Sequence, residues 1–230
     1  MQFDAFGDPD DTPLLFPLGW GNRPDHENVA WLVDRLVDAG YHVHTATIPT
    51  TVTDFERAYL RPVARYADAN PPAALLSHST GGLIAAHLDR AVPRVYLSPW
   101  WGIAGGTGGL RGLLLRLPTA RSVLPVPTDG DAIGDLATDR QLREGPDGIA
   151  PAFLRTVHEA QKRLPPLRED SVVFCTLTDQ VVSVRAIGER TPASRVRVYD
   201  GGHEFFSSSG RGAVADRVID ALSRSDPGAV

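Results

Sequence analysis

Cysteine is nearly absent from the 230-residue chain: Cys175 is the only one, which excludes a disulfide within the molecule. It lies inside the apolar run 171–177, where a thiol is typical of a small buried side chain rather than of a nucleophile. The sequence also lacks any stretch near the roughly 20 apolar residues of a membrane-spanning helix. No basic segment followed by an apolar one stands at the N-terminus. We therefore expect a cytoplasmic protein with no membrane span.

Positive charge is limited in amount and in kind. Lys162 is the only lysine among the 23 lysine and arginine residues, the formal net charge is −5, and the sequence has no basic stripe. Nucleic-acid binding needs a basic face, so the composition predicts no nucleic-acid partner. With 42% hydrophobic residues, a chain of this length can bury one large core. The oligomeric state is left open by the sequence.

Apolar periodicity alternates along the chain between strand-like and helix-like segments. Because nearly every predicted strand is followed by a helix or a long crossover, we expect a doubly wound α/β sheet of mostly parallel strands. Pro62, inside the second predicted helix, predicts a bend or break there. The predicted strands are 13–16, 41–48, 73–76, 94–98, 171–177 and 195–199. The predicted helices are 25–40, 53–69, 82–88, 151–163, 182–190 and 212–223.

A serine-centred motif, Ser-His-Ser-Thr-Gly at 77–81, lies between the apolar run 73–76 and the helix-like run 82–88. This arrangement predicts a strand, a sharp turn and a helix. A serine hydroxyl becomes a useful nucleophile only when it is exposed beside a base and near hydrogen-bond donors, which such a turn supplies in part. The usual pattern is G-x-S-x-G, and Ser77 replaces its first glycine with another small residue. The motif makes Ser79 a candidate nucleophile, although similar strings also occur in ordinary turns.

Two further residues complete the pattern. Asp179 follows the apolar run 171–177, and His203 follows the run 195–199. The chain order serine, aspartate, histidine, with each residue just beyond a predicted strand, is the order found in α/β-hydrolases. On these residues the chain resembles an α/β-hydrolase of the compact esterase and lipase-like kind. The resemblance covers about 170 residues and implies that Ser79 is the nucleophile, His203 the general base and Asp179 the residue that orients it.

The resemblance extends to the segment after the first predicted strand. Gly-Trp-Gly at 19–21 is similar to the oxyanion loop of pimeloyl-ACP methyl ester esterases, and Leu18 stands where the family usually has histidine. The oxyanion hole uses backbone N–H groups, so the change at Leu18 need not abolish activity. We expect its donors to be the amides of Trp20 and Thr80.

The stretch 99–168 is longer than one crossover helix needs. By the resemblance it is expected to form a lid inserted after the sixth family strand, while 1–98 and 169–230 form the hydrolase core. Glycines between 102 and 109 would allow it to hinge. Trp100 and Trp101 are predicted to line an acyl or alcohol pocket. The alternative is that both tryptophans simply pack the lid onto the core.

Other polar residues of the sequence have structural interpretations. His42 and His44 share one face of a strand, but no carboxylate or cysteine spacing completes a metal site, so no metal is expected. His78 normally points away from the attack path at its position in such a turn. Asp200 competes with Asp179 for His203, but it stands only three residues before the histidine. Glu204 is expected to be solvated or structural.

The predicted function is acyl transfer through an acyl-serine intermediate. The expected substrate is a small-molecule ester or thioester with a hydrophobic acyl or alcohol group, and no cofactor is expected. Two alternatives stay open at this point. One is a C–C hydrolase or lyase that uses the same three residues, and the other is a non-catalytic binding protein of the same fold.

Overall fold

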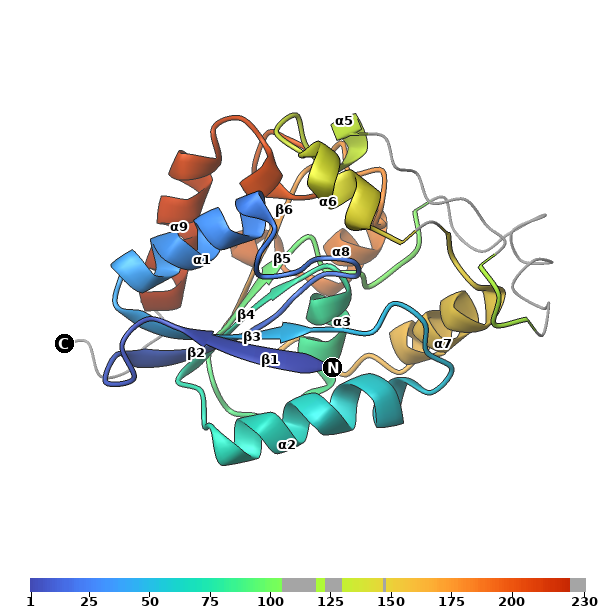
Figure 1. Ribbon diagram of the computed structural model, residues 1–230, viewed down its shortest axis with the longest axis horizontal. Coiled ribbons are helices and arrows are strands. Elements are labelled where there is room, and N and C mark those ends of the chain that lie inside the picture. The colour runs from blue at the N-terminus through green and yellow to red at the C-terminus, as the bar shows by residue number, and fades with distance from the viewer. Residues whose placement is uncertain (105–118, 123–129, 147, 224–230) are drawn as a thin grey trace.

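The computed structural model describes residues 1–104, 119–122, 130–146 and 148–223, and it contains one seven-stranded sheet (Figure 1). The strand order is β1-β3-β2-β4-β5-β6-β7. Only β1 runs antiparallel to its neighbour, β3, and the other pairs are parallel. The expected doubly wound, mostly parallel sheet is therefore confirmed. The strands are β1 Gln2–Phe6, β2 Thr12–Pro17, β3 Tyr41–Thr47, β4 Ala74–His78, β5 Arg94–Leu97, β6 Ser171–Cys175 and β7 Val196–Val198.

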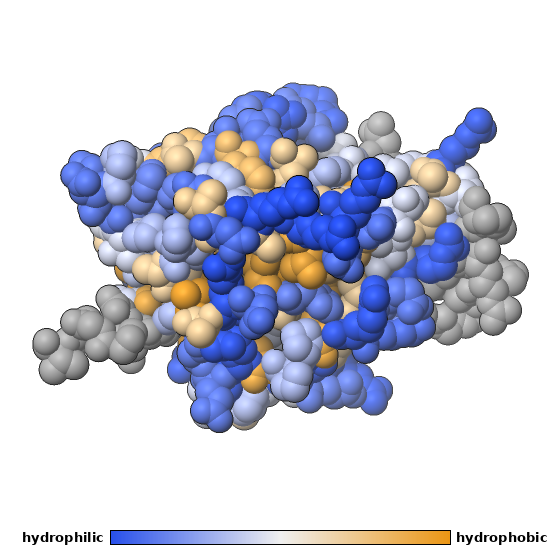
Figure 2. All heavy atoms as spheres, turned by 90° about the horizontal axis from the view of Figure 1, so that it is seen from below, coloured by the Kyte–Doolittle hydropathy of each residue, from blue (hydrophilic) through white to orange (hydrophobic). Residues whose placement is uncertain are grey.

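Helices cover both faces of this sheet (Figure 1). One face packs against α1 and α9, and the other packs against α2, α3, α7 and α8. Figure 2 views the molecule from the side of α2 and shows apolar surface near the middle of that face, surrounded by strongly hydrophilic side chains. The helices are α1 Glu27–Asp38, α2 Arg61–Ala69, α3 Thr80–His87, α5 Gly130–Ile133, α6 Asp139–Glu144, α7 Pro151–Lys162, α8 Val184–Arg190 and α9 Arg211–Ser223.

Alternate residues of the central strands supply two apolar layers. Leu14 and Phe16 of β2 enter the layer beneath α1 and α9, whereas Leu15 enters the opposite layer. The same alternation holds in β5, where Tyr96 faces the opposite way from Val95. Because strands buried on both faces need apolar residues at successive positions, they read as continuous apolar runs.

Two local features differ in detail from the sequence expectations. The strand β1 was not predicted, because an edge strand with largely half-buried and exposed side chains lacks a strong apolar pattern. Before Pro62 the chain forms a π-helical turn, Glu56–Leu60, and α2 then begins at Arg61. The backbone stays helical through Leu60 and Arg61, so Pro62 lies inside one continuous helix, and the π-helical turn lies where this proline supplies no N–H to the preceding turn. The sequence predicted a bend or break at this proline, and the structure has a change from π-helical to α-helical turns instead.

Part of the expected lid lies outside the described residues, including most of the glycine-rich segment and the whole of the apolar run 113–117. Its described portions form α5, α6 and α7. Within the described ranges, no helix has the length and apolar character needed to cross a bilayer.

The close contact between α3 and the end of β2 depends on Gly81. A Cβ atom at this position would lie 2.0 Å from the carbonyl oxygen of Pro17, a backbone atom that cannot move aside like a side chain. By contrast, a Cβ at Gly188 in α8 would meet nothing within 4 Å. The first turn of α3 can approach the sheet this closely only because Gly81 has no side chain.

We expect Gly81→Ala to lower the free energy of unfolding by about 3 kcal/mol or more, at the upper end of the cost of overpacking a core. The matched control is Gly188→Ala, which should be neutral or stabilising by up to about 1 kcal/mol, since alanine is favoured over glycine within a helix. Urea unfolding followed by circular dichroism measures both values. Equal stabilities of the two variants would contradict this account of the α3 contact.

Candidate active site

Ser79 lies at the junction of β4 and α3 in a strained backbone conformation. Its φ and ψ are 49° and −115°, which a non-glycine residue adopts only at a cost of about 1 to 3 kcal/mol. Neighbouring backbone groups hold it there: Ser79 N–H donates to Leu97 O at 3.0 Å, and Ser79 O accepts from the Trp100 N–H at 2.9 Å. The predicted strand, sharp turn and helix are therefore present, with the serine at the turn.

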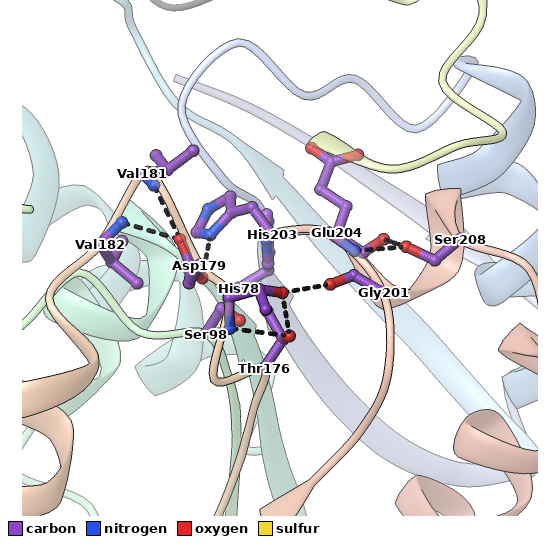
Figure 3. Close-up of polar contacts among 12 residues, drawn as sticks. His78, Ser98, Thr176, Asp179, Val181, Val182, Gly201, His203, Glu204 and Ser208 are labelled. Atoms are coloured by element: carbon purple, nitrogen blue, oxygen red, sulfur yellow. Dashed lines mark hydrogen bonds and ion pairs between the residues drawn. The ribbon is translucent and has the colours of Figure 1, made fainter. Parts of the chain in front are cut away.

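His203 and Asp179 form a buried hydrogen-bonded pair (Figure 3). His203 Nδ1 lies 2.8 Å from Asp179 Oδ2. The other carboxylate oxygen, Oδ1, accepts the backbone N–H groups of Val181 at 2.8 Å and Val182 at 2.9 Å. Burial raises the pKa of Asp179, but the neighbouring His203 and these amide donors lower it more, so that the net pKa is below the ordinary value. Asp200, the competing carboxylate, is exposed to solvent.

The imidazole ring of His203 lies against the ring of His78, the residue before Ser79. The two histidine rings lie 4.8 Å apart, and His78 directly precedes Ser79 (Figure 3). In the described structure Ser79 Oγ makes no hydrogen bond to His203. Such bonds are often long until a substrate is bound, so the geometry places the two residues in one region without yet joining them.

The two amides expected to hold an oxyanion are both unoccupied. Among the described groups, neither the Trp20 N–H nor the Thr80 N–H donates to an acceptor. Thr80 is the first residue of α3, where helical N–H groups lack partners and the helix dipole favours negative charge. The Trp20 side chain fixes its loop, because Nε1 donates to Thr50 O at 2.8 Å and the ring stacks on Phe153 at 5.4 Å.

Trp100 and Trp101 are both buried, but their surroundings differ. Trp100 holds the backbone of Ser79, as described above, and its ring lies 6.0 Å from that of Phe153 in α7. Trp101 packs against Tyr96, and its Nε1 donates to Gly82 O at 3.3 Å. Trp100 is thus beside the serine turn and close to Phe153, while Trp101 packs along α3.

The carboxylate next to His203 is buried and structural rather than solvated. Glu204 is only 4% exposed, and it accepts hydrogen bonds from Asn22 Nδ2 at 2.8 Å, Gln141 Nε2 at 2.5 Å and Ser207 Oγ at 2.8 Å. Asn22 Oδ1 in turn lies 3.2 Å from His78 Nδ1. Since Asn22 turns its NH₂ group toward Glu204, its oxygen faces His78, and the Nδ1 of His78 is the donor. We call Glu204, Asn22, Gln141, Ser207 and His78 the Glu204 network.

The Glu204 network joins segments that are far apart in the sequence. Asn22 comes from the loop after β2, His78 from the serine turn, Gln141 from α6, and Glu204 from the loop that carries His203. In the sequence, Asn22 and Gln141 are separated from Glu204 by 182 and 63 residues, and only Ser207 is close to it. Proximity along the sequence therefore could not reveal it.

The loop that carries His203 is also fixed through its backbone. His203 N–H donates to Ala132 O and Glu204 N–H to Ile133 O, both at 2.9 Å. Tyr199 OH donates to His203 O at 3.0 Å. A Cβ at Gly202 would lie 2.5 Å from Ile133 O, so this approach of α5 requires glycine. Helix α5, in the segment 99–168, thus packs directly on the histidine loop.

The histidine pair on β3 forms a different arrangement. His44 Nε2 lies 3.1 Å from His42 Nδ1, and His44 Nδ1 lies 2.8 Å from Tyr66 OH. Among the described residues, no group of three or more histidine, cysteine, aspartate or glutamate side chains is placed to hold a metal ion. The pair therefore satisfies its own hydrogen-bonding groups together with Tyr66.

Comparison with known proteins assigns the family. A model of the alpha/beta hydrolase family matches residues 11–217, which is most of the chain. The fold and the order of the serine, aspartate and histidine residues agree with that match. The chain belongs to the alpha/beta hydrolase family. Sequence comparison with curated proteins gave no match.

Solved structures with the same fold include lipases and an epoxide hydrolase. The monoacylglycerol lipase of Paleococcus ferrophilus aligns with a TM-score of 0.73 at 17% identity, covering 96% of this chain and 98% of that one. A soluble variant of the Saccharomyces cerevisiae monoglyceride lipase aligns with a TM-score of 0.74 at 14% identity, covering 97% and 92%. Epoxide hydrolase A of Mycobacterium thermoresistibile aligns with a TM-score of 0.64 at 15% identity, covering 96% and 94%. At these identities the likeness shows the fold alone.

The Glu204 network predicts a stability effect. In Glu204→Gln, the new NH₂ group faces donors that the carboxylate accepted, so at least one buried group loses its partner. We expect the free energy of unfolding to fall by about 2 kcal/mol or more. The control is Glu189→Gln, at an exposed ion pair with Arg185, which should change it by less than about 0.5 kcal/mol. Urea titrations of both variants test this, and a Glu204→Gln protein as stable as its control would contradict it.

His78 predicts a pH effect. Burial lowers the pKa of its ring well below the ordinary value, and the neighbouring His203 lowers it further. As pH falls below about 6.5, the unfolded chain binds a proton that folded His78 excludes, so the free energy of unfolding falls by up to about 1.4 kcal/mol per pH unit. His78→Asn keeps a donor toward Asn22 but does not titrate. The stability difference between parent and variant should therefore change between about pH 7 and pH 5. Parallel pH curves from denaturant titrations would refute this role of burial.

Proposed function

We propose that this alpha/beta hydrolase cleaves a carboxylic ester, or a thioester, through an acyl intermediate on Ser79. The observation that carries the proposal is the 2.8 Å hydrogen bond between buried His203 and Asp179, together with a strained serine turn whose neighbouring amides donate to no described acceptor. A base oriented by a carboxylate, a serine at a strand-to-helix turn and free N–H donors are the parts that acyl transfer requires.

Each proposed step has a residue with suitable chemistry. His203 takes the proton of Ser79 as the hydroxyl attacks the carbonyl carbon, and the amides of Trp20 and Thr80 hold the oxyanion. His203 then gives its proton to the leaving alcohol or thiol, and the acyl group stays on Ser79. Water, activated by His203, releases the acid and restores the serine. Asp179 keeps Nδ1 protonated, so that Nε2 is the basic nitrogen.

The proposed substrate carries a hydrophobic acyl or alcohol group. Trp20 and Trp100 both contact Phe153 of α7, so aromatic side chains from the loop after β2, the segment after β5 and α7 lie together. Several structural neighbours are lipases or esterases, and this supports such a substrate. We also propose that Trp101 belongs to the same pocket wall, that 99–168 acts as a lid, and that the enzyme works in the cytoplasm.

The test is pre-steady-state hydrolysis of a p-nitrophenyl ester. A burst of p-nitrophenol that matches the enzyme concentration is expected, because acylation precedes slower deacylation. Ser79→Ala should abolish the burst and lower the turnover rate by about 10³-fold or more.

The control for this test is Ser77→Ala in the same turn. Its buried Oγ makes no hydrogen bond to any described group, so the burst should remain. Turnover that survives in Ser79→Ala at the parent rate would overturn the acyl-serine mechanism. Turnover without a burst in the parent would instead favour a C–C hydrolase or lyase in which the serine is not acylated.

A further inference from the structure

A cavity lies at the other end of α3 from Ser79. Its volume is about 310 Å³, at the lower end of the range for small-molecule sites. It is formed by the last residues of α3, the first half of β5, the end of α8 and the segment 165–168. Since α3 has eight residues, the cavity is about 12 Å along the helix from the serine turn. Its lining is Ala86, His87, Leu88, Asp89, Arg94, Tyr96, Trp101, Pro165, Pro166, Leu167, Arg168 and Arg190.

A buried arginine forms part of its wall. Arg94 is 2% exposed, and its guanidinium donates to the carbonyl oxygens of Ala85 at 2.6 Å, Leu88 at 2.7 Å and Arg90 at 2.6 Å. The carbonyls of Ala85 and Leu88 lie at the C-terminal end of α3, where the helix dipole favours a cation. Within the described residues Arg94 has no carboxylate partner, and its Nε–H makes no hydrogen bond. A full positive charge is thus buried with partial negative charges alone to balance it.

Two more guanidinium groups face the same space. Arg190 lies over the ring of Trp101, 5.9 Å from its centroid, and donates to the carbonyl oxygen of Pro165. It pairs with no carboxylate in the described part of the chain, and burial lowers its pKa. Arg168 Nε lies 3.4 Å from Asp170 Oδ1, and exposed Asp89 is the one acidic residue of the lining. Three cations against two carboxylates leave a positive excess in a chain whose net charge is −5.

The remaining walls are apolar and partly aromatic. Tyr96 and Trp101 supply ring surface, and Leu88, Leu167 and the two prolines add aliphatic surface. Free phosphate would find cations here but would leave these walls without a partner. A flat apolar body with one carboxylate uses both, since it can pack on the rings while the guanidiniums bind its oxygens.

We propose that this cavity binds a small organic carboxylate with a flat apolar body, such as an aryl carboxylate, with Arg190 and Arg94 as its charged partners. The site is separate from Ser79, His203 and Asp179, shares only the Trp101 ring with the proposed substrate pocket, and does not depend on the proposed esterase activity. Arg94 holds the end of the helix that begins beside Ser79, and Trp101 donates to Gly82 in its first turn. The occupant would therefore contact the two residues that fix both ends of α3.

Isothermal titration calorimetry with benzoate tests the proposal. Benzoate should bind the parent protein, and benzamide, which has the same shape without the charge, should bind at least about tenfold more weakly. Inorganic phosphate should also bind more weakly than benzoate, because it cannot use the aromatic walls.

The decisive variant is Arg190→Gln, which removes one partly exposed cation and leaves the buried Arg94 intact. It should weaken benzoate binding about tenfold or more. Arg185→Gln is the matched control, because Arg185 lies on the same helix, is 88% exposed and is not part of the lining. Its affinity for benzoate should equal that of the parent.

Several outcomes would overturn the proposal: no saturable benzoate binding to the parent, equal binding of benzamide, equal or tighter binding of phosphate, or equal losses in the two variants. If benzoate bound instead at the serine turn, as a product-like acid, its affinity would be unchanged in Arg190→Gln. The variant therefore distinguishes binding at the serine turn from binding in the cavity. Loss of ester hydrolysis in Ser79→Ala, with benzoate binding unchanged, would support two independent sites.

Discussion

The tight turn between β4 and α3 is the constraint on which the rest of the site depends. Ser79 can hold its left-handed backbone only because β5 binds its N–H and the Trp100 amide binds its carbonyl. The same turn requires the first coil of α3 to lie against Pro17, at a distance that only glycine permits. Strain at one residue is thus sustained by contacts from three neighbouring segments. The hydroxyl, the free Thr80 amide and the approach of the oxyanion loop all follow from this geometry.

A second principle is the use of neutral partners around buried charge. Glu204 and Arg94 are both almost fully buried, and neither is paired with an opposite full charge among the described residues. Glu204 is stabilised by amide and hydroxyl donors, and Arg94 by carbonyl oxygens at a helix end. Such charges are costly unless every partner is in place, so they favour one arrangement of the loops that carry those partners.

Local sequence patterns were sufficient for much of the fold and for the outline of the site. The parallel sheet followed from predicted strands that alternate with helices, and Asp179 and His203 were proposed because each lies just beyond such a strand. The edge strand β1 was not predicted, because its half-buried and exposed residues do not alternate between apolar and polar side chains clearly enough. The Glu204 network and the cavity at Arg94 depend on residues that meet only after the sheet is assembled. The catalytic and binding roles assigned to individual residues stay predictions: Ser79, Asp179, His203, Trp20, Thr80, Trp100 and Trp101.

The contact between α5 and the histidine loop has a consequence for how this enzyme can change. The carbonyls of Ala132 and Ile133 hold the backbone of His203 and Glu204, and Gln141 contributes to the same support. A lid that only shielded a substrate could be replaced as a unit by the lid of a related protein. Here a transplanted insertion would have to reproduce these backbone acceptors as well as its own pocket. New substrate ranges should therefore arise more readily by point substitution within this segment than by wholesale replacement of it.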